Sequence, residues 1–216
     1  MSTGSPRTPP TEPTRPPRAI AAFDFDGTIT RRDTLGPFLV HVAGRRRVTA
    51  AMGRRLPAMA GSLRNDALRD VTKERILGDV LAGRAHDELI AAGDRYATTL
   101  IDRFRPEALE RIDWHRSQAH ELVVVSASLV YYLRPVARRL GFDDVIGVEM
   151  ETRDGRLTGA LAGPNVRADE KPRRLRSWIG DGGAEIWAYG NSSGDEALLA
   201  AADHAVWMGK RADRNP

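Results

Sequence analysis

The feature that most constrains this chain is an apolar run over residues 19–25 that is interrupted by one carboxylate, Asp24, and followed directly by a second, Asp26. Such a run predicts a buried strand, and Gly27 marks the turn out of it. Residues two apart on a strand share one face, so the two carboxylates would crowd together and repel each other. A plain turn and helix cap would also place acids here, but such a pair is costly without a counterion. Mg²⁺ is a hard cation that oxygen ligands hold, so the motif predicts an Mg²⁺ site.

A long stretch of helical pattern follows this predicted strand. From about residue 33 to 119, apolar residues recur at helical spacing, as at Leu77, Leu81, Leu89 and Ile90. Glycine and proline near positions 44, 57, 61, 83 and 106 divide the stretch into several helices. The pattern predicts a helical insertion at 33–119.

The hydrophobic period changes after residue 120. Gly141 is a plausible C-cap for a helix that ends near Arg139, and Asp154-Gly155 is a hairpin signal because both positions tolerate positive φ. Alternating strands and helices predict an α/β fold with a mostly parallel sheet covered on both faces. The insertion would then lie above the carboxyl edge, where such sheets bind ligands. The predicted strands cover 122–125, 145–152, 156–161, 185–189 and 205–208, and later helices cover 172–179 and 195–202.

Composition excludes several classes of protein. With 216 residues, 41% of them hydrophobic, the chain can bury a substantial core. It has no cysteine, which rules out disulfides, thiolate zinc sites and a cysteine nucleophile. No apolar run approaches the roughly 18 residues that a membrane span needs, so we expect no stable membrane insertion.

The N-terminal residues 1–18 are rich in proline, threonine and arginine, and we predict a disordered tail. They lack the apolar stretch of a secretory signal, so we expect a cytoplasmic location. The net charge is only +4 and aromatic residues are sparse, so we expect no nucleic-acid partner. The sequence leaves the oligomeric state open.

Three further polar groups follow predicted strands or begin predicted helices. Ser126 follows the strand at 122–125, Lys171 precedes the helix at 172–179, and a polar loop at 190–195 follows the strand at 185–189. Each has a plainer reading: a helix cap, a surface charge, and an ordinary strand-to-helix loop. Together at one sheet edge, they would instead offer hydroxyl, ammonium, amide and carboxylate groups to a phosphate and its metal ion.

In this order the motifs resemble the four motifs of haloacid dehalogenase-type phosphatases. The helical insertion resembles the C1-type cap of the phosphoserine phosphatase-like subfamily IB. The resemblance implies a Rossmann-like core at 19–32 and 120–216 with a mostly parallel five-stranded sheet, and a cap at 33–119. The motifs are Phe23-Asp24-Phe25-Asp26-Gly27-Thr28, then Ser126, then Lys171, and then Gly190-Asn191-Ser192-Ser193-Gly194-Asp195.

The resemblance also implies roles for these residues. Asp24 would be the nucleophile that forms an aspartyl-phosphate, and Asp26 would be the general acid and base. Ser126 and Lys171 would bind the transferring phosphoryl group. Mg²⁺ would be held by Asp24, the backbone carbonyl of Asp26 and Asn191, with Asp195 beside the metal or orienting Lys171.

The substrate implied is a small phosphorylated metabolite, with phosphoserine as one candidate. Asp33 lies where related enzymes place an acidic residue that faces the substrate, and Arg75, or Lys73, would meet a second anionic group. The remaining substrate-binding residues implied around the phosphoryl group are Gly27, Thr28, Ala127 and Ser128.

One position departs from the family pattern. Family members usually carry aspartate where this chain has Asn191, and the loss of a negative charge should lower the affinity for Mg²⁺. Two alternatives therefore stay open: a non-catalytic phosphate-binding relative, and a phosphotransferase that uses an alcohol in place of water.

Overall fold

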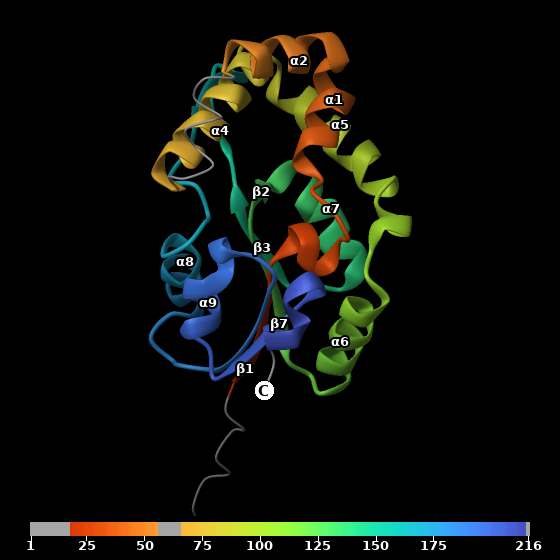
Figure 1. Cartoon of the computed structure of the whole chain (residues 1–216), viewed down its shortest axis with the longest axis vertical. Helices are drawn as coiled ribbons and strands as arrows, with labels where there is room; N and C mark the ends of the chain where they lie inside the picture. The colour runs from red at the N-terminus through yellow and green to blue at the C-terminus, as the bar shows by residue number, and fades with distance from the viewer. Residues whose placement is uncertain (1–17, 56–65, 215–216) are drawn as a thin grey trace, which may run out of the picture.

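The computed structural model describes residues 18–55 and 66–214, which form an α/β body beneath a group of helices (Figure 1). The predicted tail lies outside the described residues except for Arg18, whose Nε is 2.6 Å from a carboxylate oxygen of Glu121. The predicted breaks at Pro57 and Gly61 also lie outside the described residues.

Five parallel strands form the central sheet, which confirms the predicted α/β fold. The strand order is β3-β2-β1-β6-β7, so the apolar β1 is the middle strand. Four of its five residues are fully buried, which explains why its sequence is apolar on both faces. The strands are β1 (Ala19–Phe23), β2 (Glu121–Leu129), β3 (Asp144–Val148), β6 (Glu185–Gly190) and β7 (His204–Trp207).

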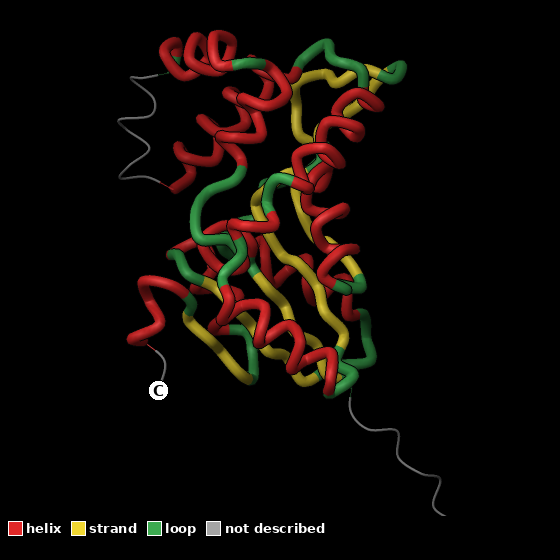
Figure 2. Tube along the Cα trace, turned by 90° about the vertical axis from the view of Figure 1, so that its right-hand side faces the viewer, coloured by secondary structure: helices red, strands yellow, loops and turns green. Residues whose placement is uncertain are grey.

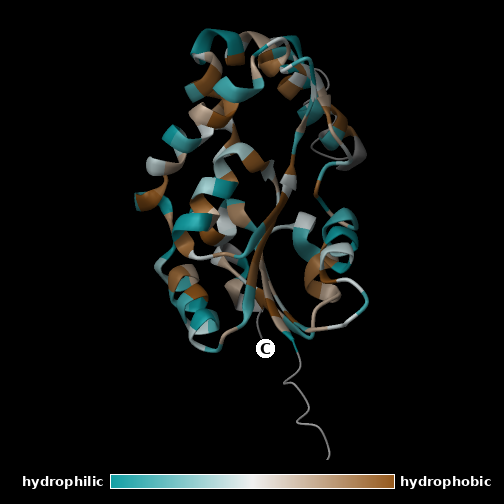
Figure 3. Ribbon diagram, turned by 180° about the vertical axis from the view of Figure 1, so that it is seen from behind, coloured by the Kyte–Doolittle hydropathy of each residue, from teal (hydrophilic) through white to brown (hydrophobic). Residues whose placement is uncertain are grey.

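Helices cover both faces of this sheet. In Figure 1, α6 and α7 lie on one side of the strands and α8 and α9 on the other, and Figure 3 shows hydrophobic strands between more polar helices. Gly141 ends α7 with a φ of 77°, as the sequence predicted. The helices are α6 (Pro106–Ser117), α7 (Val130–Leu140), α8 (Glu170–Ile179) and the short α9 (Glu196–Ala200).

The cap helices lie over the carboxyl edge of the sheet (Figure 2). Within the described part of 33–105 there are helices and no strands, apart from single bridges at Ala85, between α4 and α5, and at Phe104. The helix α6 packs on β2, so we propose that it belongs with the core and that the cap ends before residue 106. The cap helices are α1 (Leu35–Ala43), α2 (Arg45–Arg54), α4 (Asp66–Leu81) and α5 (His86–Thr98), followed by the single turn η2 (Ile101–Arg103).

A separate hairpin follows β3. The sequence predicted one strand over 145–152, but the structure divides it between β3, which pairs with β2, and β4 (Met150–Arg153), which pairs with β5 (Arg156–Leu161). The turn residues Asp154 and Gly155 have φ values of 49° and 72°, so the hairpin prediction is confirmed. The hairpin contacts α4 of the cap.

The described helices include none with both the length and the apolar character needed to cross a membrane.

Candidate active site

Asp24 lies at the carboxyl end of the central strand. Its backbone N–H continues the ladder to β6 by donating to the carbonyl oxygen of Tyr189 at 2.9 Å. The side chain is buried, and its Oδ1 accepts a hydrogen bond from Lys171 Nζ at 2.7 Å while Oδ2 accepts one from the Thr28 hydroxyl at 2.9 Å. Burial raises the pKa of Asp24 to about 6, although the Lys171 ammonium opposes that rise.

Lys171 joins Asp24 to a second carboxylate. Its Nζ donates to Asp195 Oδ1 at 2.6 Å, and its side chain is 2% exposed. Burial alone would lower the pKa of Lys171, but Asp24 and Asp195 outweigh it and raise the pKa. The lysine therefore stays charged and compensates two buried carboxylates at once.

Both carboxylate oxygens of Asp195 are occupied by hydrogen bonds. While Oδ1 binds Lys171, Oδ2 accepts hydrogen bonds from the backbone N–H groups of Asn191 and Ser192 and from the Ser192 hydroxyl, at 3.1, 2.9 and 2.7 Å. Asp195 thus shapes the loop after β6 and orients Lys171. Its expected place beside the metal stays a prediction.

The carboxylate of Asp26 is held by two hydroxyl groups. Its Oδ1 accepts bonds from the backbone N–H and the hydroxyl of Thr34 at 2.7 and 2.6 Å, and its Oδ2 accepts one from the Ser128 hydroxyl. Burial, and next the charge of Asp33, raise the pKa of Asp26 to about 7. The side chain is fixed at the cavity wall and can carry a proton near neutral pH. Thr34 has no motif to mark it, so the sequence did not reveal this contact.

The strand β2 brings Ser126, Ala127 and Ser128 to the same place. The predicted strand ended at residue 125, but β2 continues to Leu129 with an irregular register between Val125 and Leu129. Such a bulge bends the strand and re-aims its side chains. Ser126 is buried, and its Oγ accepts a hydrogen bond from the backbone N–H of Ser128 at 3.1 Å.

The Asn191 side chain packs against the turn after Asp24 only because residue 27 is a glycine. Gly27 has a φ of 84°, and a Cβ on it would lie 2.0 Å from Asn191 Nδ2. A side chain at position 27 would therefore displace the Asn191 amide. The Asn191 Oδ1 also lies 3.4 Å from the Thr28 hydroxyl, so the first and last motifs meet here.

A cavity of about 500 Å³ is lined by these groups. Ten of the predicted site residues line it, while Thr28 lies buried behind Asp24. Arg75 is exposed and does not line the cavity, but Lys73 does. Residues two apart on a helix point in very different directions, so α4 can bring only one of the two to the cavity. The ten residues are Asp24, Asp26, Gly27, Asp33, Ser126, Ala127, Ser128, Lys171, Asn191 and Asp195.

Lys73 links the cap to the core at the cavity wall. Its ammonium donates to the carbonyl oxygen of Ala127 and, at 3.0 Å, to Asn165 Oδ1, while Asn165 Nδ2 donates to Asp70 at 2.7 Å. Burial lowers the pKa of Lys73 to about 8. Its direct hydrogen bonds are to neutral oxygens, so the ammonium keeps its attraction for an anion in the cavity.

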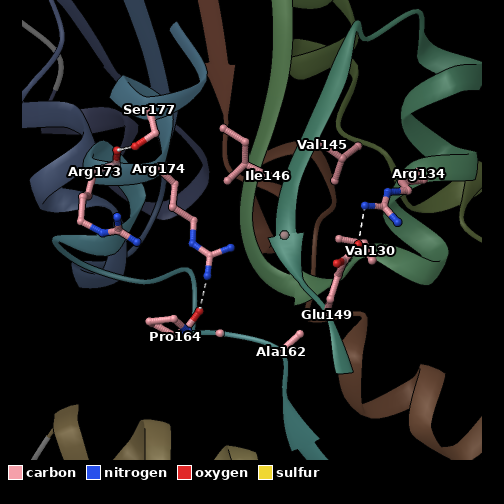
Figure 4. A pocket seen from close by; sticks show the side chains of 12 residues that line it. Val130, Arg134, Val145, Ile146, Glu149, Ala162, Pro164, Arg173, Arg174 and Ser177 are labelled. Carbon is pink, nitrogen blue, oxygen red and sulfur yellow. Dashed lines mark hydrogen bonds and ion pairs between the residues drawn. The ribbon is translucent and has the colours of Figure 1, made fainter. Parts of the chain in front are cut away.

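A second cavity of about 420 Å³ lies outside the edge strand β3 (Figure 4). Its charged groups are largely matched to partners: Arg134 pairs with Glu149, and Arg174 donates to the carbonyl of Pro164 at 2.8 Å. None of the predicted site residues lines it. The chemistry-bearing groups therefore gather in the first cavity.

The donor set in the first cavity suits a hard cation. Among the described residues, no three His, Asp or Glu side chains are grouped to hold a metal. The available oxygens are of mixed kind instead: the Asp24 carboxylate, the Asp26 backbone carbonyl and the Asn191 amide, and oxygen donors of these kinds fit Mg²⁺.

The site consists of two carboxylates, Asp24 and Asp195, that share the buried Lys171 at the edge of a parallel sheet, with helices inserted over it. This arrangement defines a hydrolase of the phosphatase-like class. The chain belongs to the family of haloacid dehalogenase-like hydrolases, whose family model matches residues 21–200. Protein CicA of Caulobacter vibrioides is 34% identical over 203 residues, covering 89% of this chain and 88% of that protein. Phosphoserine phosphatase SerB1 of Mycobacterium tuberculosis is 26% identical, covering 95% and 68% respectively. A solved protein of unknown function from Bordetella pertussis Tohama I superposes with a TM-score of 0.75 at 25% identity, covering 88% and 90%.

Proposed function

We propose that this chain is an Mg²⁺-dependent phosphatase that hydrolyses a small phosphomonoester through an aspartyl-phosphate on Asp24. The observation that carries the proposal is the contrast between two carboxylates on one turn. Asp24 binds a buried lysine, which favours a charged nucleophile, whereas Asp26 has the higher pKa of the two, about 7, which suits an acid. Pairs of carboxylates whose environments separate their pKa values commonly divide the acid and nucleophile roles in this way.

In the first step, an Asp24 carboxylate oxygen attacks phosphorus. The bond from phosphorus to the ester oxygen breaks, and Asp26 gives its proton to the leaving alkoxide. Ser126 and Lys171 line the cavity beside Asp24, where they would bind the phosphoryl oxygens and stabilise their charge.

In the second step, water attacks the phosphorus of the aspartyl-phosphate. Asp26, now ionised, takes a proton from this water, and the bond from phosphorus to Asp24 breaks. Phosphate leaves, and both carboxyl groups return to their starting states.

Mg²⁺ would be held by the Asp24 carboxylate, the Asp26 backbone carbonyl and the Asn191 side-chain oxygen. When bound, it supplies positive charge beside the phosphoryl oxygens. Asn191 also keeps open the alternative of a non-catalytic phosphate-binding relative, because an amide attracts the cation less strongly than a carboxylate.

The substrate class proposed is a small phosphorylated metabolite that carries further charge. Besides the motif residues, the lining of the cavity has the acidic residues Asp33 and Asp70 and the basic residues Arg31, Arg32, Lys73 and Arg167. A zwitterionic ester such as phosphoserine matches both signs, and SerB1 is named for that substrate.

The test is turnover of p-nitrophenyl phosphate and of a panel of metabolite phosphomonoesters. We expect Mg²⁺-dependent phosphate release that stops on chelation and is abolished by Asp24→Asn. Asp181→Asn, which removes an exposed carboxylate outside the cavity, is the matched control and should keep wild-type activity. Full turnover by Asp24→Asn would overturn the assignment of the nucleophile, and no turnover of any ester would favour the non-catalytic alternative.

A further inference from the structure

We propose that Arg105 is a positioning residue that fixes the Gly27 turn and thereby holds Asn191 in place against the turn that follows Asp24. The inference rests on the function proposed above, and it assigns a task to a residue outside the four motifs. Arg105 is the residue before α6, where the chain returns from the cap to the core.

The chain segments entering and leaving the cap are paired with each other. The backbone N–H of Arg105 donates to the carbonyl of Ile29 at 2.8 Å, and that of Arg31 donates to the carbonyl of Arg103 at 2.9 Å. Between these bonds, Thr30 and Phe104 form an antiparallel bridge. The backbone thus places Arg105 beside the turn that follows Asp24.

The side chain of Arg105 then binds the turn itself. Its Nε donates to the carbonyl oxygen of Gly27 at 3.0 Å, and the side chain is only 18% exposed. Its Nη1 donates to Glu107, whose side chain is 52% exposed, at 3.1 Å. A planar guanidinium with one donor on a carbonyl and another on a carboxylate has a fixed orientation.

A second glycine makes room for this guanidinium. A Cβ on Gly209, in the segment after β7, would lie 2.7 Å from Arg105 Nη2 and 3.3 Å from the Gly27 carbonyl oxygen. The guanidinium is therefore enclosed between the turn and the C-terminal segment.

The position of the Gly27 peptide decides how close Asn191 can come. The Asn191 amide occupies the space that a Cβ on Gly27 would need, so rotation of the Gly27 backbone would close or open that space. By holding the carbonyl of Gly27, Arg105 fixes this backbone. Its loss should loosen the turn and leave Asn191 without a fixed position against Gly27 and Thr28.

The first readout is hydrogen exchange of the backbone amides at 24–31, measured on the full chain without ligand. We expect Arg105→Met to speed this exchange about tenfold or more, and Arg105→Lys to have a smaller effect because a lysine can still donate to the carbonyl. Glu107→Gln removes only the ion pair, and Arg111→Met removes an exposed arginine on α6, so both should exchange as the wild type does.

The second readout is the kinetics of p-nitrophenyl phosphate hydrolysis. Arg105→Met should lower kcat about tenfold or more and raise the Mg²⁺ concentration for half-maximal rate, with KM changed less than about threefold. If this variant fails to fold, Gly209→Ala replaces it, because it crowds the guanidinium while leaving Arg105 in the chain.

Wild-type exchange at 24–31 in folded Arg105→Met would overturn the inference, and so would an equal effect of Glu107→Gln. Because exchange is measured without turnover, it decides the role of Arg105 even if no phosphoester is hydrolysed, which would count against the proposed function alone.

Discussion

Lys171 and Asp195 form an ion pair at 2.6 Å in which each side chain is 2% exposed. The same ammonium lies 2.7 Å from Asp24, so a single buried cation faces two buried carboxylates. Removal of one partner from such a group leaves charge buried without compensation, which is strongly destabilising. The centre that we propose for catalysis is therefore also a determinant of stability.

Replacing Lys171 with methionine should lower the free energy of unfolding by about 3–5 kcal/mol at pH 7 and abolish phosphatase activity. Urea denaturation followed by circular dichroism measures the first effect. The double variant with Lys171→Met and Asp195→Asn should recover part of the stability but no activity. A loss below about 1 kcal/mol in the single variant would contradict the balance of charges described above.

Gly27→Ala should destabilise the chain by about 2 kcal/mol or more, because alanine is strained at a φ of 84° and its Cβ would meet Asn191. Gly182→Ala is the control, since a Cβ there meets no atom within 4 Å. Adding Asn191→Ala to Gly27→Ala removes the clash and should restore part of the stability. Equal losses of stability at positions 27 and 182 would show that the close approach of Asn191 to Gly27 does not contribute to stability.

Asp26→Asn should slow release of the leaving group from alkyl phosphates far more than from aryl phosphates. An alkoxide needs a proton as it leaves, whereas p-nitrophenolate does not, so we expect the rate of this first step to fall about 10²–10⁴-fold for the alkyl ester and much less for the aryl ester. The second step needs Asp26 as the base with either substrate, so the first turnover is measured by rapid mixing, with phosphoserine and p-nitrophenyl phosphate in parallel and Asp181→Asn as the unaffected reference. Equal losses in the first-turnover rate of leaving-group release on both substrates would mean that Asp26 does not serve as the acid.

Asn191→Asp should lower the Mg²⁺ concentration for half-maximal activity about tenfold, because it adds a negative charge next to the proposed cation position. Mg²⁺ titration of chelator-treated protein measures this, and calorimetry detects the binding independently of turnover. Ser193→Ala changes an exposed side chain of the same loop and should leave the titration unchanged. An unchanged Mg²⁺ requirement in Asn191→Asp would remove Asn191 from the proposed ligand set.

The pH dependence of stability should reveal His115, which is fully buried between His120 and the Tyr189 hydroxyl, both at 2.8 Å. Burial lowers its pKa from 6.5 to about 4. Between these values the unfolded chain binds the proton that the folded chain does not, so acid destabilises the fold as pH falls from 6.5 to 4, by up to about 3 kcal/mol.

His115→Gln should be less stable than the wild type at pH 8, because hydrogen bonds are lost. This difference should narrow as pH falls, since the variant has no imidazole to titrate. Urea denaturation at pH 8, 6 and 5 measures the difference, and a gap that stays constant would contradict the buried neutral histidine.

The motifs at strand ends could be predicted because a buried strand requires apolar residues and the polar residues of the site follow it directly in the sequence. The central strand requires apolar residues up to Phe23, and Asp24 follows at once. The hairpin at Asp154-Gly155 was equally visible, since positive φ at both positions restricts the residue types. Local sequence signals of this kind do not depend on the rest of the fold.

Contacts between distant segments could not be read in this way. Nothing near Thr34 or Ser128 marks them as partners of Asp26, because the cap entrance and the bulge in β2 bring them together. Which of Lys73 and Arg75 faces the cavity depends on how α4 is rotated about its own axis relative to the core. The local sequence pattern does not determine this rotation. The occupied oxygens of Asp195 likewise follow from the loop conformation.

The hairpin of β4 and β5 has a consequence for how substrates enter. It leaves the core after β3, yet backbone hydrogen bonds of 2.8 Å from Gly83 to Leu157 and 2.9 Å from Leu157 to Arg84 join it to the cap. Gly78 and Gly159 also bring the backbones of α4 and β5 close together. The hairpin therefore joins the cap to the core by two more chain segments, besides the two ends of the cap itself. For the phosphatase that we propose, we expect these extra connections to limit how far the cap can move from the core, which would favour compact esters over those attached to bulky carriers.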